Sequence, residues 1–221
     1  LSKPKENQIK DIAHQLIQIV GDMYPIPDQE IRTYIERILG SLNSEQLQDI
    51  LLRKLTYADK IKAKIRLHAD NYAESRFNDL IKVGKVYAEP SWRIPEMIVP
   101  GNLGASIAKS LYEREGSMNN FETTVIADIA ALSNIIFWHR NLGRGKGFNI
   151  NGYKSNHYPD FIAGTKAGRI ILIETKGDDR DNSDSQAKCR LVNKWAELAG
   201  KNFNYFMVFD KKPVEGACNV E

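Results

Sequence analysis

The chain contains very little cysteine and no long apolar run. Its 221 residues include two cysteines, Cys189 and Cys218. They are too few for a disulfide framework and lack the spacing of metal ligands, which is typical of a protein of the reducing cytoplasm. No apolar stretch approaches the ~20 residues of a membrane span, and the Lys-rich start is not followed by the apolar region of a signal peptide. We therefore expect a cytoplasmic protein without a membrane partner.

The sequence also lacks a strong excess of one charge. Its 31 basic and 28 acidic residues leave a net charge of +3, so any surface for a polyanion must be local. The segment Gly143-Arg144-Gly145-Lys146 does not match the Gly-x-x-x-x-Gly-Lys-Ser/Thr pattern of a nucleotide-binding P-loop. Because the chain begins with Leu1 rather than Met, we expect it to be a piece of a longer protein.

The first part of the chain is expected to form a helical subdomain or linker over residues 1–82. Apolar residues recur at helical spacing over residues 6–23, over residues 28–40 and from Ser44 to about Phe77. The last of these stretches is one long helix or two helices. Residues 83–118 form a connecting segment that several prolines interrupt, with a short strand at 86–88 and a short helix around 107–112.

Regular patterns return in the predicted third segment, residues 119–221. A helix over about 120–132 precedes a strand at 135–138, and two further apolar runs form a hairpin. A helix that Ser183 or Asp184 caps, and that Gly200 ends, precedes a last strand at 203–209. This order predicts an α/β fold, a small mixed sheet with flanking helices.

The hairpin carries the residues that point to chemistry. Side chains alternate along a strand, so Glu174 and Lys176 lie on one face and Thr175 on the other. A register centred on Lys166 places Asp160 opposite Leu172, as a diagonal neighbour of Glu174 on the same face. Mg²⁺ prefers oxygen ligands and usually takes one or two protein carboxylates, so the two acids can share one such ion. Lys176 can then position the attacking water and offset the charge that develops on a phosphate.

A simpler interpretation exists for each of these residues. An Asp before a strand is commonly a turn cap, and a Glu-x-Lys pair is commonly a solvated ion pair. The four apolar residues 170–173 favour a site, because they indicate a buried strand whose charges emerge at one end.

The hairpin resembles the PD-(D/E)xK nuclease superfamily. Pro159-Asp160 followed by Glu174-Thr175-Lys176 matches its motif, and residues 158–161 with 173–177 are similar to the C-terminal endonuclease domain of type III restriction enzyme Res subunits. The resemblance covers about residues 119–210. It implies a restriction-endonuclease-like core of one helix, a three-strand meander, a helix and a strand, preceded here by the all-helical segment.

The resemblance also assigns further residues to the site. It implies catalytic roles for Asp160, Glu174, Lys176, Glu122 and Gln186, and metal ligation by Asp160, Glu174, Thr175 and Glu122. Connectivity supports this grouping, because the expected topology makes Trp138, Asp160 and Glu174 neighbours and brings the start of the 120–132 helix, with Glu122, to the same edge. Glu122 can instead serve only the helix dipole, and Gln186 can be an ordinary surface residue.

The long loop after the first strand is expected to overhang that edge. Its cationic and polar side chains suit contact with nucleic-acid phosphates. The candidate DNA-binding residues are Arg140, Arg144, Lys146, Lys154 and His157.

These observations lead to one main functional hypothesis. The resemblance implies a Mg²⁺-dependent endonuclease domain, with Mn²⁺ as a substitute, that hydrolyses double-stranded DNA. It also implies a parent polypeptide with an ATP-dependent helicase motor, a part that this chain lacks, and a methyltransferase modification subunit as partner. Two alternatives stay open: a binding module that keeps the nuclease fold without cleavage, and a helical interaction protein in which Glu174 and Lys176 form only a surface pair.

Overall fold

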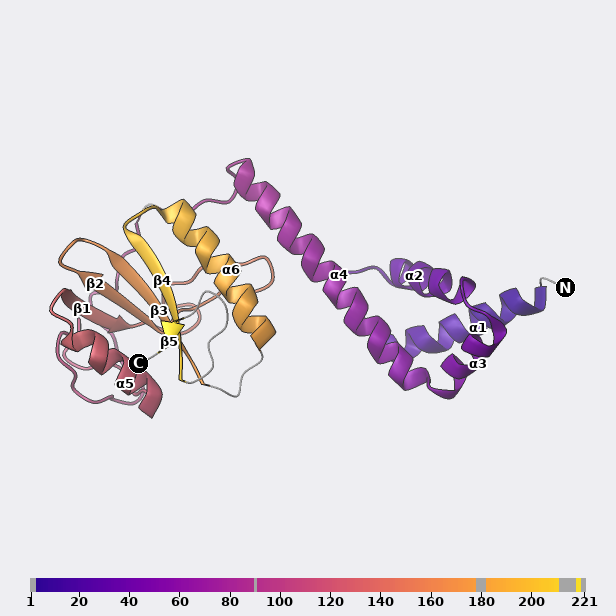
Figure 1. Ribbon diagram of the computed structural model, residues 1–221, viewed down its shortest axis with the longest axis horizontal. Helices are drawn as coiled ribbons and strands as arrows, with labels where there is room; N and C mark the ends of the chain where they lie inside the picture. Colours follow the sequence, from indigo (N-terminus) through magenta and orange to yellow (C-terminus); the bar gives the residue numbers. More distant parts are fainter. Residues whose placement is uncertain (1–2, 90, 178–181, 211–217, 220–221) are drawn as a thin grey trace. The chain divides into compact units, whose positions relative to one another are not determined.

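A helical unit forms the first part of the chain (Figure 1). In the computed structural model, which describes residues 3–89, 91–177, 182–210 and 218–219, the helices here are α1 (Lys3–Val20), α2 (Asp28–Gly40), α3 (Ser44–Leu52) and α4 (Lys54–Lys82). The chain divides into two units, residues 1–76 and 77–221, and α4 runs across this boundary. The expected helical segment 1–82 thus ends six residues beyond the first unit.

The apolar residues at helical spacing form the core of the first unit. They include Leu16 of α1, Ile35 of α2, Leu47 of α3 and Ile61 of α4, all buried in one cluster. The long periodic stretch after Ser44 is two helices, and the break lies at Arg53, whose φ of −122° and ψ of 37° are not helical.

Helices α3 and α5 begin at the expected residues, Ser44 and Asn120, and in each case the residue before the first helical one is the cap. Asn43 rather than Ser44 caps α3, because its side chain accepts from the Gln46 backbone N–H while the Gln46 side chain accepts from the Asn43 N–H. Asn119 caps α5 (Asn120–Ala131) in the same reciprocal way with Glu122. A capping box satisfies two N–H groups at once, which favours the residue three positions before the Gln or Glu.

The second unit is built on a mixed β-sheet. Within the described residues its strands are β1 (Ile135–Arg140), β2 (Phe161–Thr165), β3 (Ile170–Lys176), β4 (Phe203–Phe209) and β5 (Cys218–Asn219), in this spatial order. β1, β2 and β3 pair antiparallel, whereas β4 and β5 continue the sheet in parallel. The α/β class is therefore confirmed. Strand β5 was not predicted, and β1 runs two residues beyond Trp138.

The two faces of the sheet pack against different helices. Phe161, Ala163 and Ile173 lie in one cluster with Val125 and Ile126 of α5. Ile162 and Leu172 alternate with them and lie in another cluster with Val192 of α6 (Asn182–Ala199). The α6 helix links β3 to β4, and its apolar side lies on the face that carries Leu172. Glu174 and Lys176, two and four residues further along β3, share that face.

Residues 83–118 lie within the second unit. The expected strand at 86–88 and the expected helix around 107–112 are absent from this described segment. Instead Ser110 forms a parallel bridge with Trp138, and Leu103 forms an antiparallel bridge with Gly116. Because β1 is an edge strand, the N–H and C=O groups of Trp138 need partners outside the sheet. The Lys109 carbonyl and the Leu111 N–H supply them, and a helical turn at 107–112 would use those groups within itself.

The register of the β2–β3 hairpin differs from the expected one by two residues. Phe161 pairs with Ile173, so Asp160 falls at the level of Glu174 rather than opposite Leu172. Gly164 stays inside β2 because the ring of Phe137 lies over it, where a Cβ atom would be 2.1 Å from Phe137 Cε1. The turn is made after Thr165, with Gly168 at φ +73° and its N–H donating to the Thr165 carbonyl.

None of the described helices is both long enough and apolar enough to cross a bilayer.

Candidate functional site

The candidate site lies at the end of β3, where two charged side chains are buried side by side. Glu174 and Lys176 are each 5% exposed, and Lys176 Nζ lies 2.6 Å from Glu174 Oε1. They point to the α6 face because of the strand alternation that also places Leu172 there. The interpretation as a solvated surface pair is therefore wrong, because both side chains are shielded from solvent. Burying two charges is costly unless each keeps a close partner, and here each is the partner of the other.

The two oxygens of Glu174 have different surroundings. Lys188 Nζ of α6 also approaches Oε1, at 3.9 Å. The other oxygen, Oε2, is buried without a hydrogen bond among the described residues, and His157 Nε2 lies 4.0 Å from it. Burial, with the nearby charge of Asp160, raises the pKa of Glu174 to about 7, against the opposing effect of Lys176 and Lys188.

Asp160 is held by the residue that separates Glu174 from Lys176. Its Oδ2 accepts from the Thr175 backbone N–H at 2.7 Å and from the Thr175 hydroxyl at 2.8 Å. Its backbone carbonyl accepts from the Asn141 N–H at 2.9 Å, which ties it to the residue after β1. The structure thus brings Asp160, Thr175, Glu174 and Lys176 together, with Thr175 orienting Asp160.

Asn141 fixes the base of the loop beside Asp160. Its side-chain amide donates to the carbonyls of Phe148 and Pro159, both at 2.8 Å, and its Oδ1 accepts from the Phe148 N–H. Arg140 at the end of β1 and Asn141 directly after it, rather than Trp138, lie nearest Asp160, because Arg140 pairs with Phe161 and Trp138 with Ala163. The expected grouping of Trp138 with the two acids is wrong for this reason.

His157 lies inside this cluster and not on a nucleic-acid surface. It is 3% exposed, and its Nε2 lies 3.0 Å from the hydroxyl of Tyr205 on β4. Its backbone exchanges two hydrogen bonds with Ile150, which fixes the end of the loop before Tyr158. Burial raises the pKa of Tyr205 above its usual range, so its hydroxyl stays protonated.

Sequence reasoning missed Lys188, Tyr205 and Asn141. For Tyr205 a signal was present, since alternation along the predicted 203–209 strand puts Tyr205 and Met207 on one face, and Met207 pairs with Glu174. Predicting Lys188 requires knowing which side of α6 faces β3, and predicting Asn141 requires knowing where β1 ends.

Glu122 does not join the two site carboxylates. Its side chain accepts from the Asn119 N–H at 3.1 Å as part of the capping box, and Arg140 Nη2 lies 3.4 Å from it. Arg140 also donates to the Ser117 carbonyl, so it is a positioned strand residue and not a loop cation. In the part of the chain that the structure describes, no three Asp, Glu, His or Cys residues form a cluster suited to a metal ion.

The other predicted residues are placed as follows. Arg144, Lys146 and Lys154 are exposed on the 141–160 loop, as expected for phosphate contacts. Gln186 belongs to α6, but its side chain lies outside the described part of the structure.

The oxygens of Asp160 and Glu174 form a donor set suited to a divalent cation. Glu174 uses Oε1 for Lys176 and keeps Oε2 without a hydrogen bond, while Asp160 uses Oδ2 for Thr175. Each acid therefore has one oxygen committed to the protein and a second oxygen that no described hydrogen bond engages. Two such carboxylates are the usual protein contribution to a Mg²⁺ site, so these residues fit the ion.

Comparison of the chain with protein-family models, with curated proteins and with solved structures finds no match.

Proposed function

We propose that the second unit is a Mg²⁺-dependent endonuclease module that hydrolyses DNA phosphodiester bonds. The observation that supports this most is the buried oxygen of Glu174, which no described residue hydrogen-bonds, next to Asp160 and beside the ammonium of Lys176. A structural ion pair needs only Glu174 and Lys176. A second carboxylate that raises the pKa of the first is unfavourable for folding, and it is typical of a site that binds a cation.

The order of elements supports a PD-(D/E)xK core. Helix α5, the antiparallel strands β1 to β3, helix α6 and the parallel strand β4 follow one another as that core requires. The likeness of residues 158–161 and 173–177 to type III Res subunits supports a wider proposal. In it the parent polypeptide carries an ATP-dependent helicase motor, works with a modification subunit and acts in the cytoplasm.

Asp160 and Glu174 would hold the metal ion. When bound, the ion supplies a Lewis acid that lowers the pKa of water and stabilises charge on the phosphate. Glu174 must lose its proton to act as a ligand, and its pKa of about 7 places this step close to neutral pH. Thr175 orients Asp160 through two hydrogen bonds to Oδ2, which would leave Oδ1 for the ion.

Lys176 holds the position at which phosphate charge develops. Its ammonium is fixed by Glu174 and shielded from solvent, so it acts in a setting where one charge has a large effect. His157 Nε2 lies 3.0 Å from the hydroxyl of Tyr205 and 4.0 Å from the buried Oε2 of Glu174, so this pair lies beside the oxygen that would meet the ion.

A plasmid-cleavage assay with Mg²⁺ tests the proposal. We expect the wild-type chain to nick or linearise DNA and EDTA to stop it. Asp160→Ala should abolish cleavage, because one carboxylate alone binds the ion poorly. Lys166→Ala, which removes an exposed lysine at the hairpin turn, is the control and should cleave normally. Full cleavage by Asp160→Ala would refute the site, and DNA binding without cleavage by the wild type would favour the non-cleaving binding module.

A further inference from the structure

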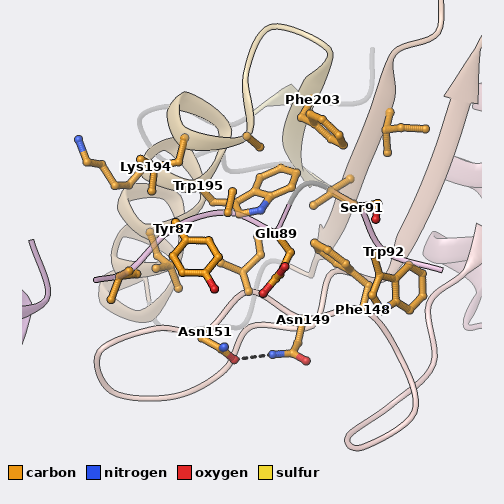
Figure 2. Close-up of a pocket in the computed structure, with 18 of the residues that line it drawn as sticks. Tyr87, Glu89, Ser91, Trp92, Phe148, Asn149, Asn151, Lys194, Trp195 and Phe203 are labelled. Atoms are coloured by element: carbon orange, nitrogen blue, oxygen red, sulfur yellow. Dashed lines mark hydrogen bonds between the residues drawn. The ribbon is translucent and has the colours of Figure 1, made fainter. Parts of the chain in front are cut away.

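A cavity separate from the candidate site lies on the α6 face of the sheet, and no role described above uses it. Its volume is about 470 Å³, within the range of ligand pockets, and residues of the second unit line it. The strands β2 and β3 supply its floor through Ile162 and Leu172. Its walls come from residues 86–89, 91, 92 and 94, from the 148–151 stretch of the loop and from α6 (Figure 2).

Aromatic rings form one continuous wall of this cavity. Trp92 packs edge-to-face on Phe148 at 5.5 Å between ring centroids, Phe148 on Trp195 at 5.8 Å, and Trp195 on Phe203 at 5.7 Å. Each ring therefore holds the next in a fixed orientation. A fixed wall of rings suits a flat aromatic ligand, which gains stacking energy without ordering the wall first.

The polar groups in the cavity are acidic or neutral. Figure 2 shows the carboxylate of Glu89 among the rings. It also shows the hydrogen bond that Asn149 Nδ2 donates to Asn151 Oδ1, which is 2.7 Å long. The amine of Lys194 points away from the cavity and donates to Glu197 at 2.8 Å. A phosphate is therefore a poor ligand here. A carboxylate only accepts hydrogen bonds, so Glu89 suits a ring that bears an amino group.

The cavity adjoins the candidate site along β3. Leu172 at its floor precedes Glu174 by two residues on the same face, a distance of about 7 Å along a strand. Ile150, which also lines the cavity, exchanges backbone hydrogen bonds with His157 of the site. One nucleotide strand can therefore present a phosphate at Lys176 and a base to the cavity.

We propose that this cavity receives one unstacked nucleobase with an exocyclic amino group (adenine, cytosine or guanine) from the strand that is cleaved. This inference rests on the proposed function, because the strand must reach Glu174 and Lys176. Proteins that take a base out of its stack read it in this way, by stacking on aromatic rings and by hydrogen bonds to its edge.

The test uses the full chain in EDTA, which prevents cleavage, and two probes. The first is a single-stranded oligonucleotide with one 2-aminopurine, a fluorescent base that bears an amino group. The second is a set of free nucleosides, whose binding quenches the fluorescence of Trp92 and Trp195. The variants are Trp92→Ala and Glu89→Gln, with Phe206→Ala as the matched control. Phe206 is 40% exposed against 39% for Trp92, and it lies outside the cavity.

We expect the wild type and Phe206→Ala to change the 2-aminopurine fluorescence equally on binding. Trp92→Ala should weaken oligonucleotide binding by at least about fivefold, the lower end of the loss for one stacked base. Adenosine and cytidine should quench tryptophan fluorescence at about tenfold lower concentration than uridine, and Glu89→Gln should remove this preference.

Two results would overturn the inference. The first is an unchanged oligonucleotide affinity in Trp92→Ala while nucleosides still bind, which would make the cavity a small-molecule site. The second is equal quenching by all nucleosides or none. Adding Mg²⁺ to the same wild-type sample and measuring cleavage tests the proposed function separately, so a failed base pocket and a failed nuclease are distinguishable.

Discussion

Glu174 Oε1 and Lys176 Nζ lie 2.6 Å apart, and both side chains are buried, but the roles expected of the two residues differ. A carboxylate is a ligand for a hard cation, whereas an ammonium has no lone pair to offer and repels the ion. The two side chains can therefore be separated by one experiment that measures binding and cleavage in the same variants.

Lys176→Ala should retain metal binding and lose cleavage. Removing the cation relieves repulsion, so Mn²⁺ affinity measured by calorimetry should be equal or higher, while the cleavage rate should fall by about 10²–10³. Glu174→Gln should lose both, because the neutral amide is a weaker ligand than the carboxylate. A Lys176→Ala protein that no longer binds Mn²⁺ would contradict this division of roles.

The raised pKa of Glu174 predicts how stability depends on pH. Its folded-state pKa of about 7 lies above the ordinary value of 4.5 for a glutamate, so folding favours the protonated form. The stability from this group is fully present below pH 4.5 and is lost as the pH rises through 7, by about 3 kcal/mol in all. Glu174→Gln should lack this loss.

Denaturant unfolding between pH 4.5 and pH 8 measures the difference. The chain has three tryptophans, Trp92, Trp138 and Trp195, and all lie in the second unit, so their fluorescence reports its unfolding. Parallel pH curves for the wild type and Glu174→Gln would show that Glu174 titrates normally.

The loop between β1 and β2 combines a fixed base with exposed cations. Asn141 and the His157–Ile150 pair hold its two ends, while Arg144 and Lys146 extend into solvent. This arrangement leaves positive charge exposed on a loop whose two ends contact the site, at Asp160 and Glu174, which suits contact with the sugar-phosphate backbone.

Replacing Arg144 and Lys146 by Ala should weaken DNA binding about equally for all sequences. Each lost phosphate contact should reduce the slope of log affinity against log salt by about 0.9. Fluorescence anisotropy with duplexes of different sequence, from low to moderate salt, measures both effects. The matched control is Lys166→Ala with Arg169→Ala, which removes two exposed cations from the hairpin turn. Equal effects of the two double variants would place the DNA elsewhere.

The chain as a whole consists of two units with separate hydrophobic cores. Leu16 and Ile126 are both fully buried, the first in α1 and the second in α5. Each core side chain packs within its own unit, so we expect damage to one core to leave the other intact.

Leu16→Ala should destabilise only the helical unit, by about 2–5 kcal/mol. Thermal unfolding followed by circular dichroism should show an earlier loss of helix, while the tryptophan fluorescence transition should not move. Ile126→Ala is the counterpart and should shift the fluorescence transition. A fluorescence shift caused by Leu16→Ala would show that the units unfold together.

The sequence by itself determined the elements and the residue types of the site. The helices of the first unit, the 203–209 strand and the burial of residues 170–173 follow from periodicity. Periodicity depends only on near neighbours in the chain. The placement of Glu174 and Lys176 on one face follows from strand alternation, which is also a local pattern. The start of the helix that carries Glu122 follows from helical periodicity.

Only the tertiary structure decided what these residues touch. The hairpin register depends on Phe137 lying over Gly164, and the burial of His157 depends on Tyr205, 48 residues away. Glu122 is an acid at the predicted helix start, yet its cap and Arg140 hold it away from the two site carboxylates. Such choices depend on which faces meet and which partners are already engaged. These contacts are determined by the free energy of packing segments that are distant in the chain, and a local sequence pattern does not give that free energy.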